Sequence, residues 1–343
     1  MFSKKKPFII AEIGANHNGS EKLIYKLIDE AKKAGANAVK FQSWNKNNIF
    51  TKKLYQNKKP DFKPHQNINS QEELIDCLTI TDNQFVKISN YCKKKNIIFS
   101  STPFDEHSLN FLNRIGMPFI KVASMDLNHL FFLKKIAKKK KPILLSTGMA
   151  NMKEIFNALE AIYSVDKNAK IIPLYCVSNY PPKDSEINLG SISYLKKTLN
   201  LDIGFSDHSN GIAASLAAIS LGARVIEKHF TLDKNMPGWD HKISADPVEM
   251  SQIVRIGKKI TKFSFNAKQK IINEDEKVPR LNMRRSIVAK NSLKKGFILK
   301  KKDIDFKRPG TGLPPDQLDN ILGKVLNKNI KKDELINKNY FKK

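Results

Sequence analysis

The sequence predicts an α/β protein: a (β/α)8 barrel over residues 1–264, a linker over 265–281 and a small β-rich domain over 282–343. Up to about residue 264, eight strand-like runs alternate with helical stretches in units of roughly 30 residues, which is typical of a closed barrel. Beyond the linker, two segments repeat one pattern. An open, doubly wound sheet is the alternative, but it usually has fewer strands and a glycine-rich first turn.

The predicted strands are short runs rich in β-branched, aromatic and aliphatic residues. They cover residues 8–14, 38–44, 97–104, 119–124, 142–147, 171–178, 202–209 and 224–230. Amphipathic patterns between them predict helices, for example over 21–35, 152–164 and 212–223. The insert 44–71 carries two prolines and many Lys and Asn residues, so we expect a long loop on the catalytic face.

The linker is rich in Lys, Asn and Glu, and the residues beyond it change in character. The segments SLKKGFILKKKDIDF (292–306) and NIKKDELINKNYF (329–341) each hold a polar turn, an apolar pair and a lysine-rich step. This internal repeat predicts a separately packed β domain with two pseudo-symmetric halves.

The chain carries a formal net charge of +28, which makes nucleic acid an obvious partner to consider. However, only seven of the 61 basic residues are Arg, the residue that base readout favours, and the lysines are spread along the chain. We therefore expect no nucleic-acid partner. There is no run of 18 apolar residues and no cleavable leader, and the three cysteines lack metal or disulfide spacing, so we expect a cytoplasmic protein without a membrane span.

Polar side chains cluster where nearly every predicted strand ends. In a (β/α)8 barrel these ends meet at one mouth, which is where such enzymes carry their sites. The charges of RVIEKHF (224–230), Glu227, Lys228 and His229, are therefore expected to face a shared pocket. The other strand-end residues are Glu12, Asn16, His17, Asn18, Lys40, Gln42, Ser101, Thr102, Phe104, Lys121, Ser124, Asp126, Ser178, Asn179, Tyr180, Ser206, Asp207 and His208.

His208 and His229 lie at the ends of neighbouring predicted strands, which are about 4.8 Å apart, so the two imidazoles can share one divalent metal ion. With oxygen ligands and no nearby cysteine, Mn²⁺ fits better than a structural zinc site; Mg²⁺ and Co²⁺ are alternatives. Lys40 and Lys121 stand within apolar strands and are suited to hold a phosphate and a carboxylate.

Seven motifs stand at or near the predicted strand ends of the barrel: AEIGANHNG (11–19), VKFQ (39–42), STPFD (101–105), FIKVAS (119–124), LSTGMA (145–150), GFSDHS (204–209) and EKHFTLD (227–233). Together they resemble the sialic acid synthase family, which makes nonulosonic acids from phosphoenolpyruvate and an N-acetylated hexosamine. The segments from residue 284 to about 312 resemble the antifreeze-like (SAF) domain, a β-clip fold, that follows the barrel in that family.

The resemblance implies roles for individual residues. It makes His208 and His229 the metal ligands, and it assigns phosphoenolpyruvate to Lys40, Thr102, Lys121, Ser124 and Ser206. It places Glu12, Gln42, Tyr180 and Asp240 around the acceptor sugar, with Arg284 or Arg285 reaching in from the partner subunit of a domain-swapped homodimer. From their places at the strand ends we add Ser178 to the phosphoenolpyruvate residues and Phe104 to the sugar residues, and Glu12 or Asp126 is our candidate for the group that moves protons.

Three positions depart from the family pattern near the expected acceptor site: Asp126, Ser178 and Trp239. The acceptor is therefore either N-acetylmannosamine or another sugar, such as a 2,4-diacetamido-trideoxyhexose. A second enzyme hypothesis keeps the barrel and phosphoenolpyruvate but uses a simple sugar phosphate. A hypothesis of another class makes the chain a lysine-rich binding protein on an inactive barrel.

Overall fold

The structure is a computed structural model that describes every residue except 1, 3–5, 264, 266–268 and 343. The chain forms two compact units, Met1–Phe265 and Asn266–Lys343. Each is described by itself below. In the described part of the chain, no helix is both long and apolar enough to cross a membrane.

The first unit is a nearly closed barrel of eight parallel strands, which confirms the predicted fold class. The hydrogen-bonded order is β3-β2-β1-β8-β7-β6-β5-β4, so each strand lies beside its sequence neighbours and β1 pairs with β8. β3 and β4 stand at the two ends of this order. Where they approach each other, the Ser100 hydroxyl donates to the Phe119 carbonyl at 3.3 Å. The strands are β1 (Phe8–Gly14), β2 (Ala38–Ser43), β3 (Ile98–Pro103), β4 (Ile120–Val122), β5 (Ile143–Ser146), β6 (Ile171–Cys176), β7 (Gly204–Asp207) and β8 (Val225–His229).

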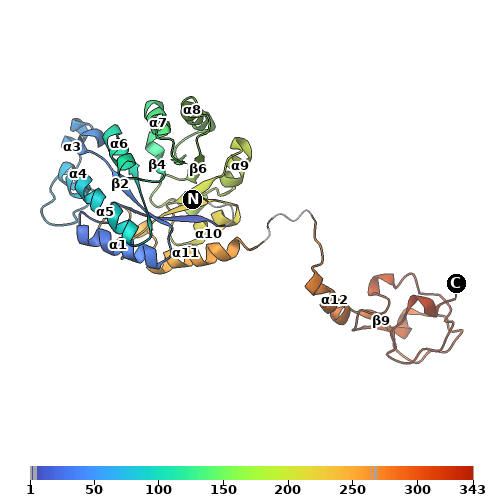
Figure 1. Ribbon diagram of the computed structural model, residues 1–343. Coiled ribbons are helices and arrows are strands. Elements are labelled where there is room, and N and C mark those ends of the chain that lie inside the picture. The colour runs from blue at the N-terminus through green and yellow to red at the C-terminus, as the bar shows by residue number, and fades with distance from the viewer. Residues whose placement is uncertain (1, 3–5, 264, 266–268, 343) are drawn as a thin grey trace. The chain divides into compact units, whose positions relative to one another are not determined.

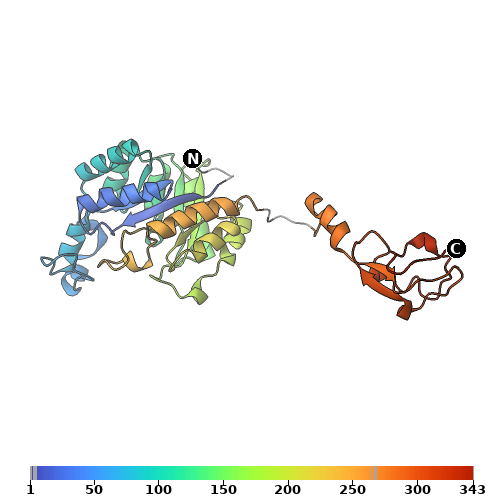
Figure 2. The same ribbon diagram turned by 90° about the horizontal axis from the view of Figure 1, so that it is seen from below.

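One main helix follows each strand and covers the outside of the sheet (Figures 1 and 2). Several begin with side-chain caps that satisfy free backbone N–H groups: Asn151 and Glu154 form a capping box, as do Asp246 and Glu249. The helices are α1 (Glu21–Lys33), α5 (Asp82–Lys94), α6 (Glu106–Arg114), α7 (Leu130–Ala137), α8 (Met152–Tyr163), α9 (Gly190–Leu199), α10 (Ala213–Ser220) and α11 (Pro247–Ile260).

Strand alternation divides the barrel's side chains into two sets. Ile9, Ala11 and Val39 pack with the helices in the larger core, whereas Ile10, Ala38 and Val225 belong to the smaller cluster inside the barrel. Two residues further along β1, β2 and β8, the inward positions become charged: these are Glu12, Lys40 and Glu227. The barrel interior is therefore apolar at the start of the strands and charged towards their carboxyl ends.

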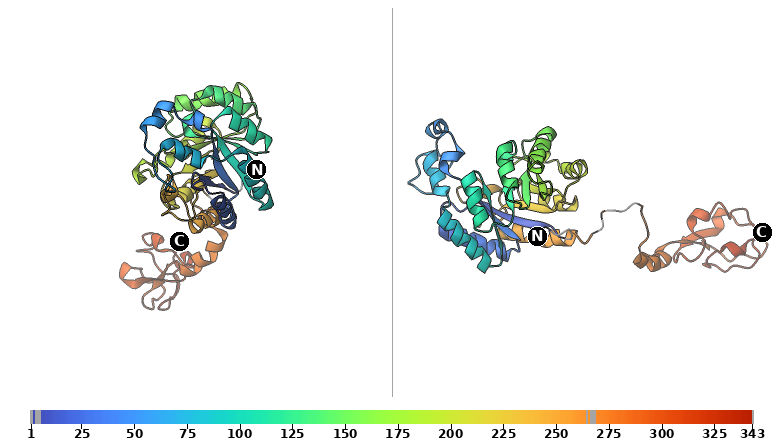
Figure 3. Two further views of the ribbon diagram at one scale, coloured as in Figure 1. Left: turned by 90° about the vertical axis from the view of Figure 1, so that its left-hand side faces the viewer. Right: turned by 45° about the horizontal axis from the view of Figure 1, so that its top comes forward.

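The insert 44–71 is not a plain loop, and that expectation is wrong in part. It contains α2 (Lys46–Ile49) and α3 (Lys52–Asn57), and α4 (Gln71–Leu78) follows. The side chains of Asn45 and Thr51 accept backbone N–H bonds at the starts of α2 and α3, which explains these short helices in a lysine- and asparagine-rich sequence. The three helices gather at one end of the first unit (Figure 3).

The second unit has its own core around Ile287, Leu299 and Ile336, and its β9 (Ser286–Ala289) pairs antiparallel with β10 (Ile304–Lys307). The two repeated segments are equivalent in structure: Leu293 bridges Ile330, and each segment turns at a residue with positive φ, +88° at Gly296 and +64° at Asp333. This confirms the predicted pseudo-symmetry.

Part of the expected linker 265–281 is helical. It contains a 3-10 turn at Glu274–Glu276 and most of α12 (Lys277–Met283). Residues 266–268 of this segment lie outside the described residues.

Candidate active site

A cavity of about 600 Å³ lies at the carboxyl ends of the barrel strands. Every barrel residue that the sequence and the resemblance singled out for a role lines it. These residues are Glu12, Lys40, Gln42, Thr102, Phe104, Lys121, Ser124, Asp126, Ser178, Tyr180, Ser206, His208, His229 and Asp240.

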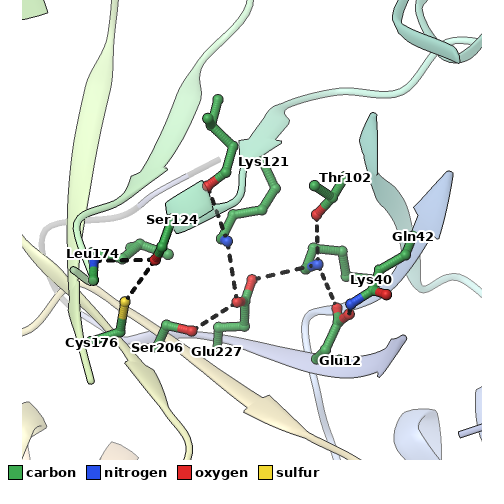
Figure 4. Close-up of polar contacts among 12 residues, drawn as sticks. Glu12, Lys40, Gln42, Thr102, Lys121, Ser124, Leu174, Cys176, Ser206 and Glu227 are labelled. Atoms are coloured by element: carbon green, nitrogen blue, oxygen red, sulfur yellow. Dashed lines mark hydrogen bonds and ion pairs between the residues drawn. The ribbon is translucent and has the colours of Figure 1, made fainter. Parts of the chain in front are cut away.

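The deepest part of the cavity is a set of four charged residues, Glu12, Lys40, Lys121 and Glu227, which we call the charged floor. Each is at most 5% exposed. Glu227 lies between the lysines: its Oε1 is 3.4 Å from Lys121 Nζ and its Oε2 is 3.9 Å from Lys40 Nζ (Figure 4). The Ser206 hydroxyl also donates to Glu227 Oε1 at 2.9 Å. These partners outweigh the effect of burial and hold the pKa of Glu227 below its usual range, so it is ionised.

Glu12 is in a different electrostatic position. Its Oε2 is 2.7 Å from Lys40 Nζ, but Lys40 also donates to the Thr102 hydroxyl at 2.8 Å and faces Glu227. Burial, opposed by Lys40 and reinforced by Glu227, raises the pKa of Glu12 to about 8. Gln42 donates to the other Glu12 oxygen at 3.4 Å. The floor therefore holds one ionised carboxylate and one carboxyl that keeps its proton near neutral pH.

The two histidines face the cavity as neighbours, with ring centroids 5.6 Å apart. Burial, together with the neighbouring His229, lowers the pKa of His208 to about 4, and burial lowers the pKa of His229 to about 3. Both rings are therefore neutral at physiological pH. His208 Nδ1 lies 2.8 Å from the Val177 carbonyl oxygen, which places the proton on Nδ1 and the lone pair on Nε2, 3.4 Å from the Ser206 hydroxyl.

His229 has one ring nitrogen without a hydrogen-bond partner among the described residues. Its Nδ1 is buried and makes no hydrogen bond to a described residue, while Asp240 Oδ2 lies 3.6 Å away. A neutral imidazole can bind a divalent cation through the ring nitrogen that carries the lone pair. Among the described residues, however, no group of three or more His, Cys, Asp or Glu residues is arranged to hold a metal ion. The geometry thus fits a site with two imidazole ligands that needs oxygen ligands from water or substrate.

Tyr180, Asp240 and Asp126 surround the histidines and the floor. The Tyr180 ring stacks on His208 with centroids 4.2 Å apart. Burial raises the pKa of Asp126 and that of Asp240 to about 6, so both carboxyls titrate close to neutral pH. Groups of this kind are common where a protein moves protons.

Ser124 and Ser178 come together around Gly148, which the sequence prediction missed. Gly148 donates its N–H to the Ser124 hydroxyl at 3.1 Å. A Cβ at this position would stand 2.3 Å from the Ser178 hydroxyl and 2.8 Å from that of Ser124, so only glycine fits. The motif LSTGMA (145–150) marked this segment, but nothing in it indicated this contact.

Several strand-end residues do not face the cavity, and the prediction for them is wrong. Lys228 and Asp207 point to the outer side of the barrel, because each alternates with cavity residues along its strand. Asn16 instead donates to the Phe230 carbonyl at 2.9 Å and to the Ser244 hydroxyl at 2.8 Å. The other strand-end residues outside the cavity lining are His17, Asn18, Ser101 and Asn179.

Sequence reasoning also missed an apolar part of the lining. It includes Trp44, Ile49, Phe50, Met125 and Met149. These residues come from loops and from the short insert helices, where no strand periodicity marks their direction.

Arg284 and Arg285 belong to the second unit. Arg285 donates from Nη1 to the Phe306 carbonyl at 2.9 Å. Arg284 is exposed and makes no side-chain hydrogen bond or ion pair with a described residue, so the two arginines differ in their freedom to bind another group.

The fold and the cavity define a (β/α)8-barrel protein with a charged site at its strand ends and a separate small β unit. The chain belongs to the NeuB family, whose model matches residues 27–269, and a SAF domain model matches residues 284–341. Both matches confirm the resemblance found in the sequence.

Individual relatives match almost the whole chain. N,N'-diacetyllegionaminic acid synthase of Campylobacter jejuni is 42% identical, with 97% of this chain and 99% of the relative covered. The protein of the same name from Legionella pneumophila is 34% identical, with 94% and 91% covered. The crystal structure of N-acetylneuraminic acid (sialic acid) synthetase from Leptospira borgpetersenii is 34% identical with a TM-score of 0.71, covering 81% of this chain and 91% of that one.

Proposed function

We propose that this protein is a nonulosonic acid synthase. It condenses phosphoenolpyruvate with an N-acetylated hexosamine and water, and releases a nine-carbon 3-deoxy keto acid and phosphate. One observation carries the proposal: two buried lysines and two neutral histidines converge on the cavity at the strand ends. The names of the relatives support the same reaction class.

Lys40 and Lys121 are the groups we assign to the phosphate and carboxylate of phosphoenolpyruvate. Both are almost fully buried, where charge-assisted hydrogen bonds are strong. The hydroxyl groups that line the same depth supply further donors and fix the orientation of the substrate. They belong to Thr102, Ser124, Ser178 and Ser206.

In the reaction, C3 of phosphoenolpyruvate attacks the aldehyde carbon of the open-chain sugar and forms the new C–C bond. The aldehyde oxygen takes up a proton, and C2 of the former phosphoenolpyruvate becomes cationic. Water adds to C2 and loses a proton. The resulting tetrahedral intermediate then collapses: its C2–O bond to phosphate breaks, inorganic phosphate leaves, and C2 becomes the ketone.

Glu12 is our first candidate for the proton that reaches the aldehyde oxygen, because its raised pKa keeps the carboxyl protonated near neutral pH. Asp126 is the second candidate, and its pKa of about 6 also allows it to accept the proton that the attacking water loses.

His208 and His229 are the residues we assign to a divalent metal, Mn²⁺ in the first place. Such an ion supplies Lewis acidity towards a carbonyl oxygen. The histidines fit this role because both rings are neutral. His229 Nδ1 makes no hydrogen bond to a described residue, and the Ser206 hydroxyl, 3.4 Å away, is the partner of His208 Nε2.

For the acceptor we favour a 2,4-diacetamido-trideoxyhexose over N-acetylmannosamine, because two relatives are named N,N'-diacetyllegionaminic acid synthase. We also propose a domain-swapped homodimer in which Arg284 completes the partner's acceptor site. Its exposed guanidinium makes no hydrogen bond or ion pair with a described residue, which leaves it available to a substrate oxygen.

A product assay tests the proposal. The purified protein is incubated with phosphoenolpyruvate, Mn²⁺ and a panel of N-acetylated hexosamines, and phosphate release and product mass are measured. We expect phosphate and a keto acid in equal amounts with at least one acceptor. No product with any of them, together with salt-dependent retention on DNA or RNA, would instead support the lysine-rich binding protein.

A further inference from the structure

The cavity changes character with depth. The charged floor is at most 5% exposed, whereas Met125 is 63% exposed and Met149 is 73% exposed. Ile49 and Phe50 also line the cavity and are partly exposed. We call Ile49, Phe50, Met125 and Met149 the outer apolar ring. The inner part of the cavity is thus charged, and the outer part offers apolar side chains.

Three separate segments build this ring. Ile49 ends α2, and Phe50 follows it with its ring 5.5 Å from that of Tyr55, whose hydroxyl donates to the Lys46 carbonyl at 2.7 Å. Met125 lies in the 3-10 turn after β4, and Met149 follows β5 with a φ of +63°. None of the four is a core residue of the barrel. Packing of the barrel core therefore does not explain their presence at the mouth.

The ring offers little to a charged group. Among the described residues that line the cavity, the lysines are Lys40 and Lys121, both on the floor, and there is no arginine. A hydroxyl or phosphate placed against these four side chains would lose water without gaining a hydrogen bond from them, which costs free energy. A methyl group placed there is stabilised because it removes apolar surface from water.

The proposed function fixes which end of the acceptor meets the ring. Phosphoenolpyruvate needs both lysines and therefore lies on the floor. Its C3 must reach the aldehyde, so the C1 end of the open-chain sugar lies over the floor as well. The C4–C6 end then extends towards the mouth.

We propose that the outer apolar ring is a specificity subsite for the C4–C6 end of the acceptor. It selects a methyl group at C6, as in a 6-deoxy sugar, and an acetamido group at C4 over free hydroxyl groups, and it disfavours a 6-phosphate. This inference rests on the proposed function.

The test compares acceptors that differ only at C6: N-acetylmannosamine, its 6-deoxy analogue and its 6-phosphate. The value of kcat/KM is measured for each from phosphate release. For the wild-type protein we expect the 6-deoxy analogue to exceed N-acetylmannosamine by about 10- to 100-fold, the usual range for one such group in an apolar pocket. The 6-phosphate should be the poorest acceptor.

The double variant Ile49→Thr with Met149→Gln makes both side chains polar and removes only one heavy atom at position 49. We expect its preference for the 6-deoxy analogue to fall below about 3-fold, since the subsite no longer favours a methyl group. The control is Leu54→Thr, which alters an exposed residue of the same insert outside the cavity lining and should keep the wild-type preference.

Two results would overturn the inference: phosphate release without a 6-deoxy preference, or a double variant that keeps the preference but changes the oligomeric state, which would make the ring a subunit contact. Failure of the proposed function looks different, because then no acceptor, including the 2,4-diacetamido sugar, would release phosphate.

Discussion

The Nζ of Lys228 lies 3.3 Å from Oδ2 of Asp207, and neither side chain is exposed. Asp207 also accepts hydrogen bonds from the Ser209 N–H at 2.9 Å and from the Ser215 hydroxyl at 2.6 Å, and Lys228 donates to the Ser209 carbonyl. These two residues directly precede His208 and His229. On the outer side of the barrel, a buried ion pair therefore joins the two strand ends that carry the histidines.

Replacing Asp207 with Asn should destabilise the barrel strongly, because it leaves the buried Lys228 ammonium without its counter-charge. We expect the free energy of unfolding to fall by about 3 kcal/mol. Urea unfolding followed by tryptophan fluorescence measures this in the barrel, since the chain's two tryptophans, Trp44 and Trp239, both lie in the first unit.

Asp76→Asn is the matched control. Asp76 pairs with Lys46 at 2.7 Å, but both side chains are more than a third exposed, so we expect a loss below about 1 kcal/mol. Adding Lys228→Met to Asp207→Asn should restore part of the stability, because the uncompensated charge is gone. If Asp76→Asn and Asp207→Asn lower the free energy of unfolding equally, the buried pair stabilises the barrel no more than an exposed pair does.

Glu12→Gln should change how stability depends on pH. Glu12 keeps its proton up to a pKa of about 8 in the folded protein, whereas its ordinary pKa is 4.5. Between pH 4.5 and about 8 the folded protein therefore holds a proton on Glu12 that the unfolded chain has lost. The free energy of unfolding of the wild type falls as the pH rises through this window, by up to about 1 kcal/mol per pH unit. Below it the contribution is constant. Glu227 is shifted downward and titrates below this window.

Glutamine carries no titrating proton, so the variant should gain stability relative to the wild type as the pH rises from 5 to 8. Urea unfolding at four pH values measures the difference, in which all other titrating groups largely cancel. A constant difference would mean that Glu12 is already ionised at pH 5.

Most of the fold was predictable from the sequence because strand and helix periodicities are local properties. All eight strands were located. Side chains alternate along a strand, so Glu227 and His229 face the cavity and Lys228 faces away from it, although we predicted that all three would face one pocket. The helices of the insert were missed, since the cap hydrogen bonds of Asn45 and Thr51 outweigh a composition that favours loops.

Much of the polar cavity lining was predictable from the sequence, but its apolar part and its electrostatics were not. Motifs marked the residues at the strand ends, yet the opposite pKa shifts of Glu12 and Glu227 depend on how Lys40 and Lys121 are shared in space. Likewise, nothing in the sequence around Met149 indicates that its side chain lines the same cavity as Phe50.

His229→Gln tests the proposed metal ligands. Chelation should abolish activity of the wild-type protein, and added Mn²⁺ should restore it. The variant should bind Mn²⁺ at least about 10-fold more weakly by titration calorimetry, with little change in urea stability, because glutamine fills much of the same volume. The control is His17→Gln: His17 is equally buried but does not line the cavity, so Mn²⁺ affinity should be unchanged. Equal affinities in His229→Gln and the wild type would contradict the assignment.

The arginines make a paired test of subunit exchange. Arg284→Ala should lose activity and stay folded, whereas Arg285→Ala removes the bond to the Phe306 carbonyl and should mainly destabilise the second unit. Mixing inactive Arg284→Ala with inactive His229→Gln chains should recover activity, since a swapped heterodimer has one intact site. No recovery, with exchange confirmed by a label, would count against the swap.

The central claim is that phosphate leaves from C2 of phosphoenolpyruvate after C–C bond formation at the charged floor. Phosphoenolpyruvate labelled with ¹⁸O at the bridging oxygen distinguishes this from cleavage at phosphorus, because the two routes send the label to different products. Mass spectrometry of both products gives the answer with any acceptor that reacts. If phosphate leaves from C2, the released phosphate carries the label; label retained in the keto acid would show that the bond to phosphorus breaks instead.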